Sequence, residues 1–575
     1  MNGNLTRHKE KSFLEIFSSY LSTSFREFIY KTPFYKQRLK GKHPLKLIRS
    51  PEDPFIGNPA IGAGVIEDKV CFSGHLIEKA EDQIWTKVNS SPALFLKEMH
   101  GFSWLPHLAT LADKKRATKR AEGLTRLWLD KNYKWSLPSW RPDLIGQRII
   151  NWTFHAPLIL SSSDMVYRSR VLNSLARQSR HLYNASNTAP SGLPRIEALI
   201  GLSISGVLVP DGEKRLQKGL TLLKVELENF ILADGGCVTR NPRDCLTVLK
   251  FIIYLKSCLI DDDKDCPEWL QNTADKIVPF LKCLQHIDKS FASFEGAFPN
   301  DAQDIKTIFQ LSNAKGKAIE NASLTGFIRT KAKNSLLIMD VGTPPNNSFS
   351  SNSHAGCLSF EFSDDKDRIV TNMGGTVLGF GGDDANLNHY SRHTGAHSTL
   401  CFRGEDIIPV STNGFLKKEV FSTQFQKKTN DDGIWIDATH NGYEKRFGAV
   451  HSRSLFLDND GNDLRGEDKL TIHPRKIFGF LGRGDEDNIG LHFILHPKVS
   501  ASPTQDGKAI ILRLAHGHGW LFRAKGGEVR LEDAIHCEKA GNSIKTLRIV
   551  VETTAPKTNS AKINWQFKKL EKNTL

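Results

Sequence analysis

Long apolar runs are missing from this sequence of 575 residues. No stretch reaches the roughly 20 consecutive apolar residues that a helix needs to cross a bilayer. Residues 1–31 contain neither an uninterrupted apolar core nor the small-residue cleavage site of a secretory signal. The sequence therefore predicts no transmembrane segment and no signal peptide, and this N-terminus favours the cytoplasm.

Cysteine pairs at metal-binding or disulfide spacing are also lacking. The nine cysteines are odd in number and scattered, and no two of them form a C-x-x-C motif. Several lie in apolar runs, where a free cysteine usually behaves as a small buried hydrophobic residue. This pattern predicts a reducing compartment and argues against disulfides and against a zinc site built from cysteine.

Nucleic-acid-binding motifs are absent although the chain is strongly basic. Its 78 Lys and Arg against 63 Asp and Glu give a formal charge of +15. Such an excess favours polyanionic partners in general, but zinc-finger spacing, an RNA-binding aromatic signature and a basic zipper are all missing. We expect no nucleic-acid partner and leave acidic polysaccharides and anionic lipid surfaces open. Simple solubility is the plain alternative.

The N-terminal residues show helical spacing of apolar side chains with Lys and Arg at the flanks. The apolar positions are Phe13, Ile16, Phe17, Tyr20, Leu21 and Phe25. A basic amphipathic helix of this kind can lie on a membrane surface, or it can pack on its own protein. Peripheral membrane contact through this helix is therefore an open hypothesis.

The chain changes character near residue 315, and its length requires more than one hydrophobic core. Before that point, segments of helical periodicity follow one another with short breaks; after it, short β-branched and aromatic runs alternate with turn residues. We predict a basic N-terminal arm (1–75), an α-helical domain in an incomplete (α/α) toroid (76–315) and a large antiparallel β-sandwich (316–575). Helices followed by strands argue against an alternating α/β fold.

Two segments of the predicted β domain are rich in proton-transfer side chains. His354 stands at the entrance to a strand, and residues 389–397 contain Tyr390, Arg392 and three histidines, the last of which is His397. Phenol and imidazole groups both donate and accept protons, and arginine neutralises carboxylates. His354, Asn372 and His397 would form a mixed metal shell if their strands are neighbours. Asn is a poor zinc ligand, so a metal-free site is equally open.

The predicted helical domain offers a second group of candidates. Gly235 and Gly236 permit a tight loop, after which Arg240 and Arg243, which we expect to be exposed, could bind an acidic sugar. His181 and Asn184 end a helix and could face the cavity of the toroid. A plain helix–helix turn is the alternative for the loop.

Taken in order, these segments resemble the heparinase II/III family of polysaccharide lyases, in particular its proteobacterial heparinase-like branch. The segments that carry the resemblance are LADGGCVTRNP (232–242), HAGCLSFEF (354–362), YSRHTGAHSTL (390–400) and THNGYEKRFGAVHSRSLFLDNDGNDLRGEDKL (439–470). The resemblance implies a toroid followed by a β-sandwich. It also implies cleavage of uronate-containing chains by β-elimination, at the periplasm or cell envelope.

The resemblance also implies roles for particular residues. Tyr390, His354 and Arg240 would be catalytic, and a structural zinc would be bound by His354, His397 and Asn372. The implied substrate-binding residues are Arg243, Asn184, His181, Arg392 and Tyr443.

Departures from the family pattern keep two other functions open. Cys237, Arg240, Asp244 and Cys245 occupy a stretch in which the family commonly has Tyr and His, and Asn372 replaces the usual metal-binding Asp. One alternative is a polysaccharide-binding or envelope-assembly protein with altered catalysis. The other is a glycoside hydrolase, which needs two carboxylates; the toroid candidates for these are Glu197, Glu226, Asp234 and Asp244. The oligomeric state is not predicted.

Overall fold

The computed structural model of the protein describes residues 25–571 except 80, 300–301, 376–386, 388, 412–413, 418–420, 474–486, 540–541 and 556–558. Most of the predicted N-terminal amphipathic helix lies outside these residues. Within them, no helix has the length and apolar character needed to cross a membrane.

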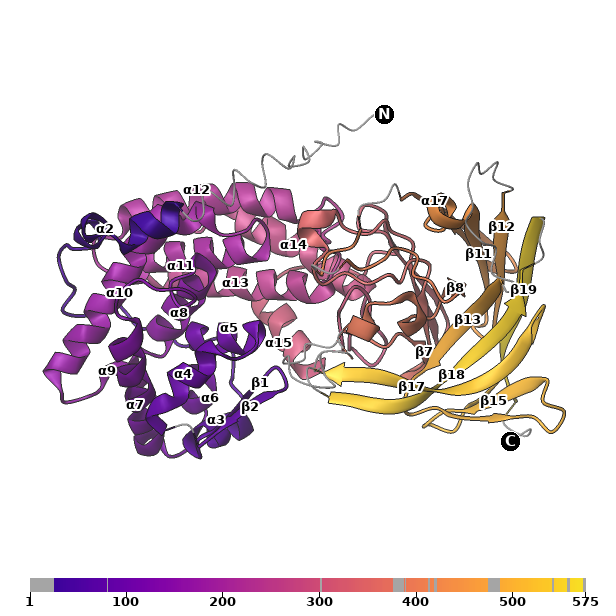
Figure 1. Ribbon diagram of the computed structural model, residues 1–575, viewed down its shortest axis with the longest axis horizontal. Coiled ribbons are helices and arrows are strands. Elements are labelled where there is room, and N and C mark those ends of the chain that lie inside the picture. Colours follow the sequence, from indigo (N-terminus) through magenta and orange to yellow (C-terminus); the bar gives the residue numbers. More distant parts are fainter. Residues whose placement is uncertain are drawn as a thin grey trace.

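The first half of the described chain is a helical domain (Figure 1). Side-chain caps begin several helices, such as Asp113 for α7, Asp164 for α10 and Asn241 for α13. Proline stands in the first turn of α8, α11 and α13. The helices are α2 (Pro33–Arg38), α3 (Pro59–Ile66), α4 (Ile84–Asn89), α5 (Ala93–Gly101), α6 (Leu105–Ala109), α7 (Lys114–Asn132), α8 (Pro142–Phe154), α9 (Ala156–Leu160), α10 (Met165–Ala185), α11 (Leu193–Leu208), α12 (Glu213–Phe230), α13 (Pro242–Asp261), α14 (Glu268–Cys283) and α15 (Ala302–Ser312).

The segment before residue 76 contributes to the core of the helical domain. Tyr35, Leu39 and Leu47 are buried in the same hydrophobic cluster as the long helices, and the Ile48 amide donates to the Leu208 carbonyl at 3.0 Å. A hairpin of β1 (Lys69–Phe72) and β2 (His75–Glu78) follows α3. From Tyr35 onward, this segment therefore belongs to the packed helical domain.

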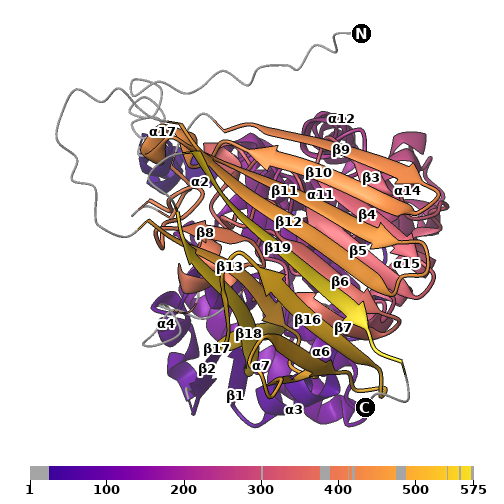
Figure 2. The same ribbon diagram turned by 90° about the vertical axis from the view of Figure 1, so that its right-hand side faces the viewer.

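The second half is built from two antiparallel sheets that face each other (Figure 2). One sheet has the order β14-β15-β16-β19-β12-β11-β10-β9, and the other β17-β18-β13-β7-β6-β5-β4-β3 with β8 paired to β13. The strands are β3 (Asn321–Ala322), β4 (Phe327–Ala332), β5 (Ser335–Asp340), β6 (Phe360–Asp364), β7 (Asp367–Thr371), β8 (Leu400–Phe402), β9 (Thr423–Asn430), β10 (Gly433–His440), β11 (Ala449–Asp458), β12 (Asp463–Ile472), β13 (Asn488–Leu495), β14 (Ser500–Pro503), β15 (Ala509–Arg513), β16 (Gly519–Lys525), β17 (Glu528–Lys539), β18 (Asn542–Thr554) and β19 (Asn559–Lys569).

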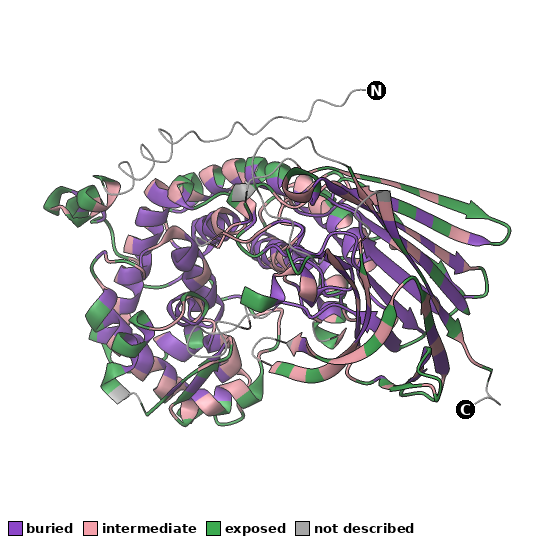
Figure 3. Cartoon of the chain, turned by 45° about the vertical axis from the view of Figure 1, so that its right-hand side comes forward, coloured by how far each residue is buried: buried purple, intermediate pink, exposed green. Residues whose placement is uncertain are grey.

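The core of the β domain lies between the sheets, where aromatic rings from both sheets meet. Phe360 stacks on Trp565 with ring centroids 5.4 Å apart, and Phe493 packs against the same indole at 4.9 Å. Figure 3 shows buried positions concentrated between the sheets and on the inner faces of the helices. The predicted fold class, helices followed by a large antiparallel β-sandwich, is confirmed.

Candidate functional site

His354 and His397 lie beside each other in the structure, which is the arrangement that the hypothesis of a shared metal shell requires of these two residues. Their ring centroids lie 5.2 Å apart and both side chains are buried. Nδ1 of His354 and both ring nitrogens of His397 have no hydrogen-bond partner among the described residues. Burial lowers the pKa of His354 well below its usual value and that of His397 to about 4. Both imidazoles are therefore neutral near pH 7.

Asn372 does not complete a metal shell with this histidine pair. Its Oδ1 accepts from the Ser398 amide at 3.0 Å, and its Nδ2 donates to Glu361 at 3.2 Å. Among the described residues, no group of three or more His, Cys, Asp or Glu side chains could hold a metal ion. The described residues thus offer two imidazoles without a third ligand and do not fit the predicted zinc site.

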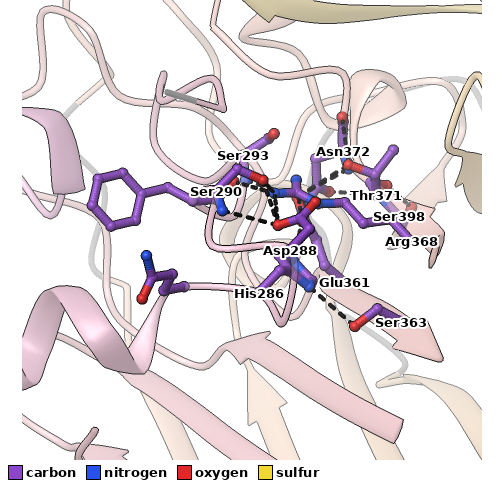
Figure 4. Close-up of polar contacts among 12 residues, drawn as sticks. His286, Asp288, Ser290, Ser293, Glu361, Ser363, Arg368, Thr371, Asn372 and Ser398 are labelled. Carbon is purple, nitrogen blue, oxygen red and sulfur yellow. Dashed lines mark hydrogen bonds and ion pairs between the residues drawn. The ribbon is translucent and has the colours of Figure 1, made fainter. Parts of the chain in front are cut away.

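Asn372 belongs instead to a buried polar network around Glu361 on β6 (Figure 4). Glu361 accepts from the Ser293 amide at 2.8 Å and contacts His286 Nε2 at 2.8 Å. Burial alone would raise the pKa of this carboxyl, but His286 and the Arg368 charge hold it at about 2. The network joins the segment after α14 to the β-sandwich.

Arg240 occupies a buried position, and the prediction that it is exposed to substrate is wrong. Its guanidinium donates to the Thr325 carbonyl at 2.7 Å and to Glu295 at 2.6 Å, and it also pairs with Asp340. Asp234 holds the same loop against the β domain by accepting from the Thr325 amide at 2.7 Å. Arg240 therefore ties the helical domain to the sandwich.

Through Glu295, Arg240 also supports the backbone beside the histidine pair. One Glu295 oxygen accepts from Arg240 and the other accepts from the His354 amide at 3.2 Å. Arg240 and Glu295 both have left-handed backbone φ values, 60° and 50°, which non-glycine residues rarely adopt. Such strain is found where surrounding contacts over-determine the conformation, which fits a positioning role for both residues.

The structure also contradicts the substrate-binding roles that we expected for Arg392 and Tyr443. Arg392 is buried and donates to the carbonyls of Ser353 at 2.9 Å, Ser350 at 3.0 Å and Gly414 at 2.6 Å. Tyr443 is buried with its hydroxyl 3.2 Å from the Leu400 carbonyl. Arg392 thus fixes the loop before His354, and neither side chain reaches solvent.

His181 and Asn184 serve the helical core rather than a cavity. The Tyr35 hydroxyl and Nδ1 of His181 share a hydrogen bond of 2.6 Å, and Asn184 donates to the Arg180 carbonyl at 2.8 Å. His181 is buried because the N-terminal segment covers it. The expectation that this pair lines a cavity is therefore wrong. Arg243, which we expected to be exposed, is half-buried.

Tyr390 is the one predicted catalytic residue that is both accessible and beside a cavity. It is 45% exposed and lines a pocket of about 320 Å³. The β17–β18 hairpin contributes Lys545 and Arg548 to the same pocket, and Arg548 is held by Glu532 at 2.7 Å. The other lining residues are Met373, Gly395, Ala396, Ile494, Asp533, Ala534 and Ile535. The arrangement combines a phenol with two cations.

A family comparison covers much of the β domain. Residues 314–566 match the model for the C-terminal domain of heparinase II/III-like proteins. This region is a heparinase II/III-like domain. The match confirms the family predicted from the motif segments, of which three lie inside it.

Solved structures share the architecture of this chain over both domains. Heparinase III superposes with a TM-score of 0.68 at 15% identity, over 84% of this chain and 79% of that one. Heparan sulfate lyase HepC from Pedobacter heparinus gives 0.57 at 16% identity, over 89% and 82%. At these identities the likeness establishes the fold, a toroid followed by a β-sandwich.

A curated relative extends over nearly the full length. The FtsZ-localized protein C of Caulobacter vibrioides is 26% identical over 555 residues, which cover 93% of this chain and 92% of the relative. Its name describes a location with FtsZ and states no enzymatic activity.

Proposed function

We propose that this protein is a polysaccharide lyase that cleaves an acidic, uronate-containing polysaccharide by β-elimination at the Tyr390 pocket. The observation that carries the proposal is the presence of the Tyr390 phenol, Lys545 and Arg548 in one cavity. Tyr390 is the proton-transfer residue that the family resemblance implies, and the two cations suit a carboxylate.

The pocket supplies the groups that β-elimination requires. The C–H bond next to the uronate carboxylate breaks, a C=C bond forms, and the bond to the leaving glycosidic oxygen breaks as that oxygen takes a proton. Arg548 and Lys545 bind the carboxylate and stabilise the charge that develops on it. The Tyr390 oxygen takes the proton from that C–H bond and then gives it to the leaving glycosidic oxygen, so that the residue ends in its starting state.

The heparinase II/III-like domain and the net charge of +15 support this proposal. The solved structures with the same fold include proteins named heparinase III and heparan sulfate lyase. A basic surface raises the local concentration of an acidic polymer. The proposal places the protein at the cell envelope, with the cytoplasm as the alternative, and leaves peripheral membrane contact through the N-terminal helix as a further hypothesis.

A second candidate function is binding of an acidic polysaccharide without cleavage. Arg240, which we predicted to be catalytic, is taken up by buried carboxylates and carbonyls. Cys237, Arg240, Asp244 and Cys245 occupy the stretch in which Tyr and His are common in the family.

To test the proposal, the full-length protein is incubated with a panel of uronate polymers. The ultraviolet absorbance of the conjugated unsaturated uronate, the product of β-elimination, is followed over time. We expect a rise with at least one polymer and a loss of about 100-fold or more in kcat for Tyr390→Phe. Tyr183→Phe, which alters a half-buried tyrosine of α10, is the matched control and retains the activity. If the absorbance does not rise but one polymer binds tightly, the lyase is rejected in favour of binding without cleavage.

A further inference from the structure

The outer face of the eight-stranded sheet presents a pair of aromatic rings to solvent. Figure 2 shows the strands of this sheet in front of the rest of the molecule. Alternate side chains of β11 point away from the sandwich core, and burial follows that alternation. Trp435 of β10 and Phe456 of β11 are cross-strand partners on the outer side, with ring centroids 4.7 Å apart. Trp435 is 41% exposed, whereas Trp520 and Trp565 on the inner side are buried.

A row of basic and amide side chains extends from this aromatic pair across the sheet. Lys428 of β9 and Arg465 of β12 take the cross-strand positions on either side of the two rings. Gln566 of β19 lies opposite Arg465, and Arg523 of β16 lies opposite Gln566. At the usual strand spacing of ~4.8 Å, a row over six strands is about 24 Å long. That length accommodates several linked sugar rings.

The rings and the groups beside them are held in place by their neighbours. The Phe456 ring lies on Gly433, where a Cβ atom would come within 2.6 Å of it. The Arg465 guanidinium is 5.7 Å from the centroid of the same ring and donates to Asp463 at 2.6 Å and 3.0 Å. Gln566 donates to the other Asp463 oxygen at 2.7 Å. Side chains that are already fixed lose little conformational entropy when a ligand binds.

This face carries positive charge that is not paired. Four of its exposed basic residues make no side-chain hydrogen bond or ion pair with another described residue; they are Lys428, Lys469, Lys525 and Arg523. The carboxylates of the face have partners: Glu467 pairs with Lys562 at 2.6 Å, and Asp463 pairs with Arg465. The free charge is therefore complementary to an acidic ligand.

We propose that this outer face is a binding platform for an acidic polysaccharide, separate from the Tyr390 pocket. The C–H face of a sugar ring stacks on Trp435, and acidic groups of the chain bind the unpaired cations. The pocket lies on the other sheet, where β13, β17 and β18 supply most of its lining. The uronate content of the polymer rests on the proposed function; the platform itself rests on the contacts above.

The composition of the face favours a polysaccharide over a protein or a nucleic acid. The centre of a protein interface is an apolar patch depleted of charge, whereas here two rings stand among charged and polar side chains. The uncharged polar residues in the neighbouring rows are Gln424, Gln426, Thr439, Ser452, Ser454 and Asn564. Amides and hydroxyls of this kind bond the hydroxyls of a sugar. The phosphates of a nucleic acid would be repelled by Asp437 and Glu467.

The platform is tested by titrating the full-length protein with heparan sulfate, alginate and the neutral polymer dextran in a calorimeter. For the acidic polymer that binds, we expect Trp435→Ala to weaken the affinity about tenfold and Lys428→Gln about threefold. Trp435→Tyr keeps a ring on the face and should restore most of the affinity. The matched controls are Phe34→Ala, which removes an exposed ring from α2, and Lys224→Gln, which removes an exposed charge from α12. Both should bind like the wild type.

Equal affinities for the wild type and Trp435→Ala would overturn the platform. An equal loss in Phe34→Ala would overturn it too, because binding would then not depend on the place of the ring. Dextran lacks acidic groups and should bind at least about tenfold more weakly; equal binding of dextran would reject an acidic ligand. A dimer that Trp435→Ala dissociates, with no change in polymer affinity, would make the face an interface between two copies of this chain instead.

The ultraviolet assay on the same polymer separates the platform from the lyase. Binding that depends on Trp435 without any unsaturated product retains the platform and rejects the lyase. Unsaturated product together with equal affinities of the wild type and Trp435→Ala retains the lyase and rejects the platform.

Discussion

At the scale of single residues, two histidines of the helical core are held neutral by burial. Trp128 Nε1 donates to Nδ1 of His100 at 3.1 Å, and the Tyr35 hydroxyl lies at hydrogen-bond distance, 2.6 Å, from Nδ1 of His181. An indole N–H can only donate, so the first contact requires a neutral imidazole at His100. Burial lowers the pKa of both residues to about 3.

These pKa values make stability depend on pH in a defined direction. Histidines in the unfolded chain have a pKa of about 6.5, so the unfolded state binds more protons below that pH. The stabilisation is fully present above about pH 6.5 and is lost as the pH falls toward 3, by at most about 1.4 kcal/mol per pH unit for each histidine. The free energy of unfolding, measured in urea, should fall less steeply between about pH 7 and pH 5 for His181→Gln than for the wild type. Parallel declines would contradict the neutral assignment of His181.

A buried ion pair on β11 and β12 should matter much more for stability than an exposed one nearby. Arg453 and Asp468 are fully buried and 2.8 Å apart, and Arg453 also donates to the Leu358 carbonyl at 2.6 Å. Arg453→Met removes the permanent positive charge beside the buried Asp468 and leaves only His451 and the Trp565 N–H in contact with that carboxylate. We expect a loss of about 3–5 kcal/mol in the free energy of unfolding. Arg465→Met removes an exposed partner of Asp463 on β12, and we expect a loss of about 1 kcal/mol or less. Denaturant unfolding of both variants checks this, and equal losses would refute it.

Some site residues were predictable from the sequence and others were not. His354 and His397 meet because each lies in a short motif beside a strand of the β domain. Arg240 was predicted to be exposed because an arginine in a Gly-containing loop usually points to solvent. Its acceptors Thr325, Glu295 and Asp340 come from three later segments, and no local pattern in the sequence connects them with the loop.

At the scale of secondary-structure elements, the helical domain depends on a close crossing of α8 and α11. Gly146 and Gly201 face each other there: a Cβ atom at position 201 would lie 2.2 Å from the Cα atom of Gly146. The two helices make one of the most extensive helix–helix contacts of the domain. The crossing also positions Glu197, whose carbonyl lies against Gly146.

Helix propensity alone predicts that Gly→Ala stabilises a helix. At this crossing we expect the same substitution to lower the stability of the protein. We expect Gly201→Ala to destabilise the protein by about 1–3 kcal/mol because the backbones must separate. Gly123→Ala in α7, where a Cβ atom meets nothing within 4 Å, should stabilise it by about 0.5–1 kcal/mol. Thermal unfolding measures both effects. A stabilising Gly201→Ala would show that the crossing is looser than described.

The positions of the helices and strands were largely predictable from the sequence, whereas the way in which distant strands pair was not. Capping residues and apolar periodicity locate helices such as α7, α10 and α13, and alternating strands identify the sandwich. The Tyr390 pocket also needs Lys545 and Arg548, which the β17–β18 hairpin supplies more than 150 positions later in the sequence. Register across such a separation is set by the packing of whole sheets and leaves no local signal.

At the scale of the whole molecule, the two domains are joined by buried polar contacts rather than by a free linker. The Arg240 contacts and the Glu361 network both connect the helical side to the β-sandwich, and Figure 4 shows the second of these. Buried contacts of this kind hold a defined arrangement only when every partner is in place. The β-sandwich that carries the Tyr390 pocket is thus held against the helical domain by contacts at two separate places.

The most direct measurement of the central claim is the mass of the fragments released from a uronate polymer by the full-length protein. β-Elimination produces a fragment with an unsaturated terminal uronate, lighter by one water than the corresponding product of hydrolysis. The account predicts the lighter fragment and its disappearance in Tyr390→Phe. Fragments that all have the mass of hydrolysis products, or a polymer that is bound and left intact, would contradict it.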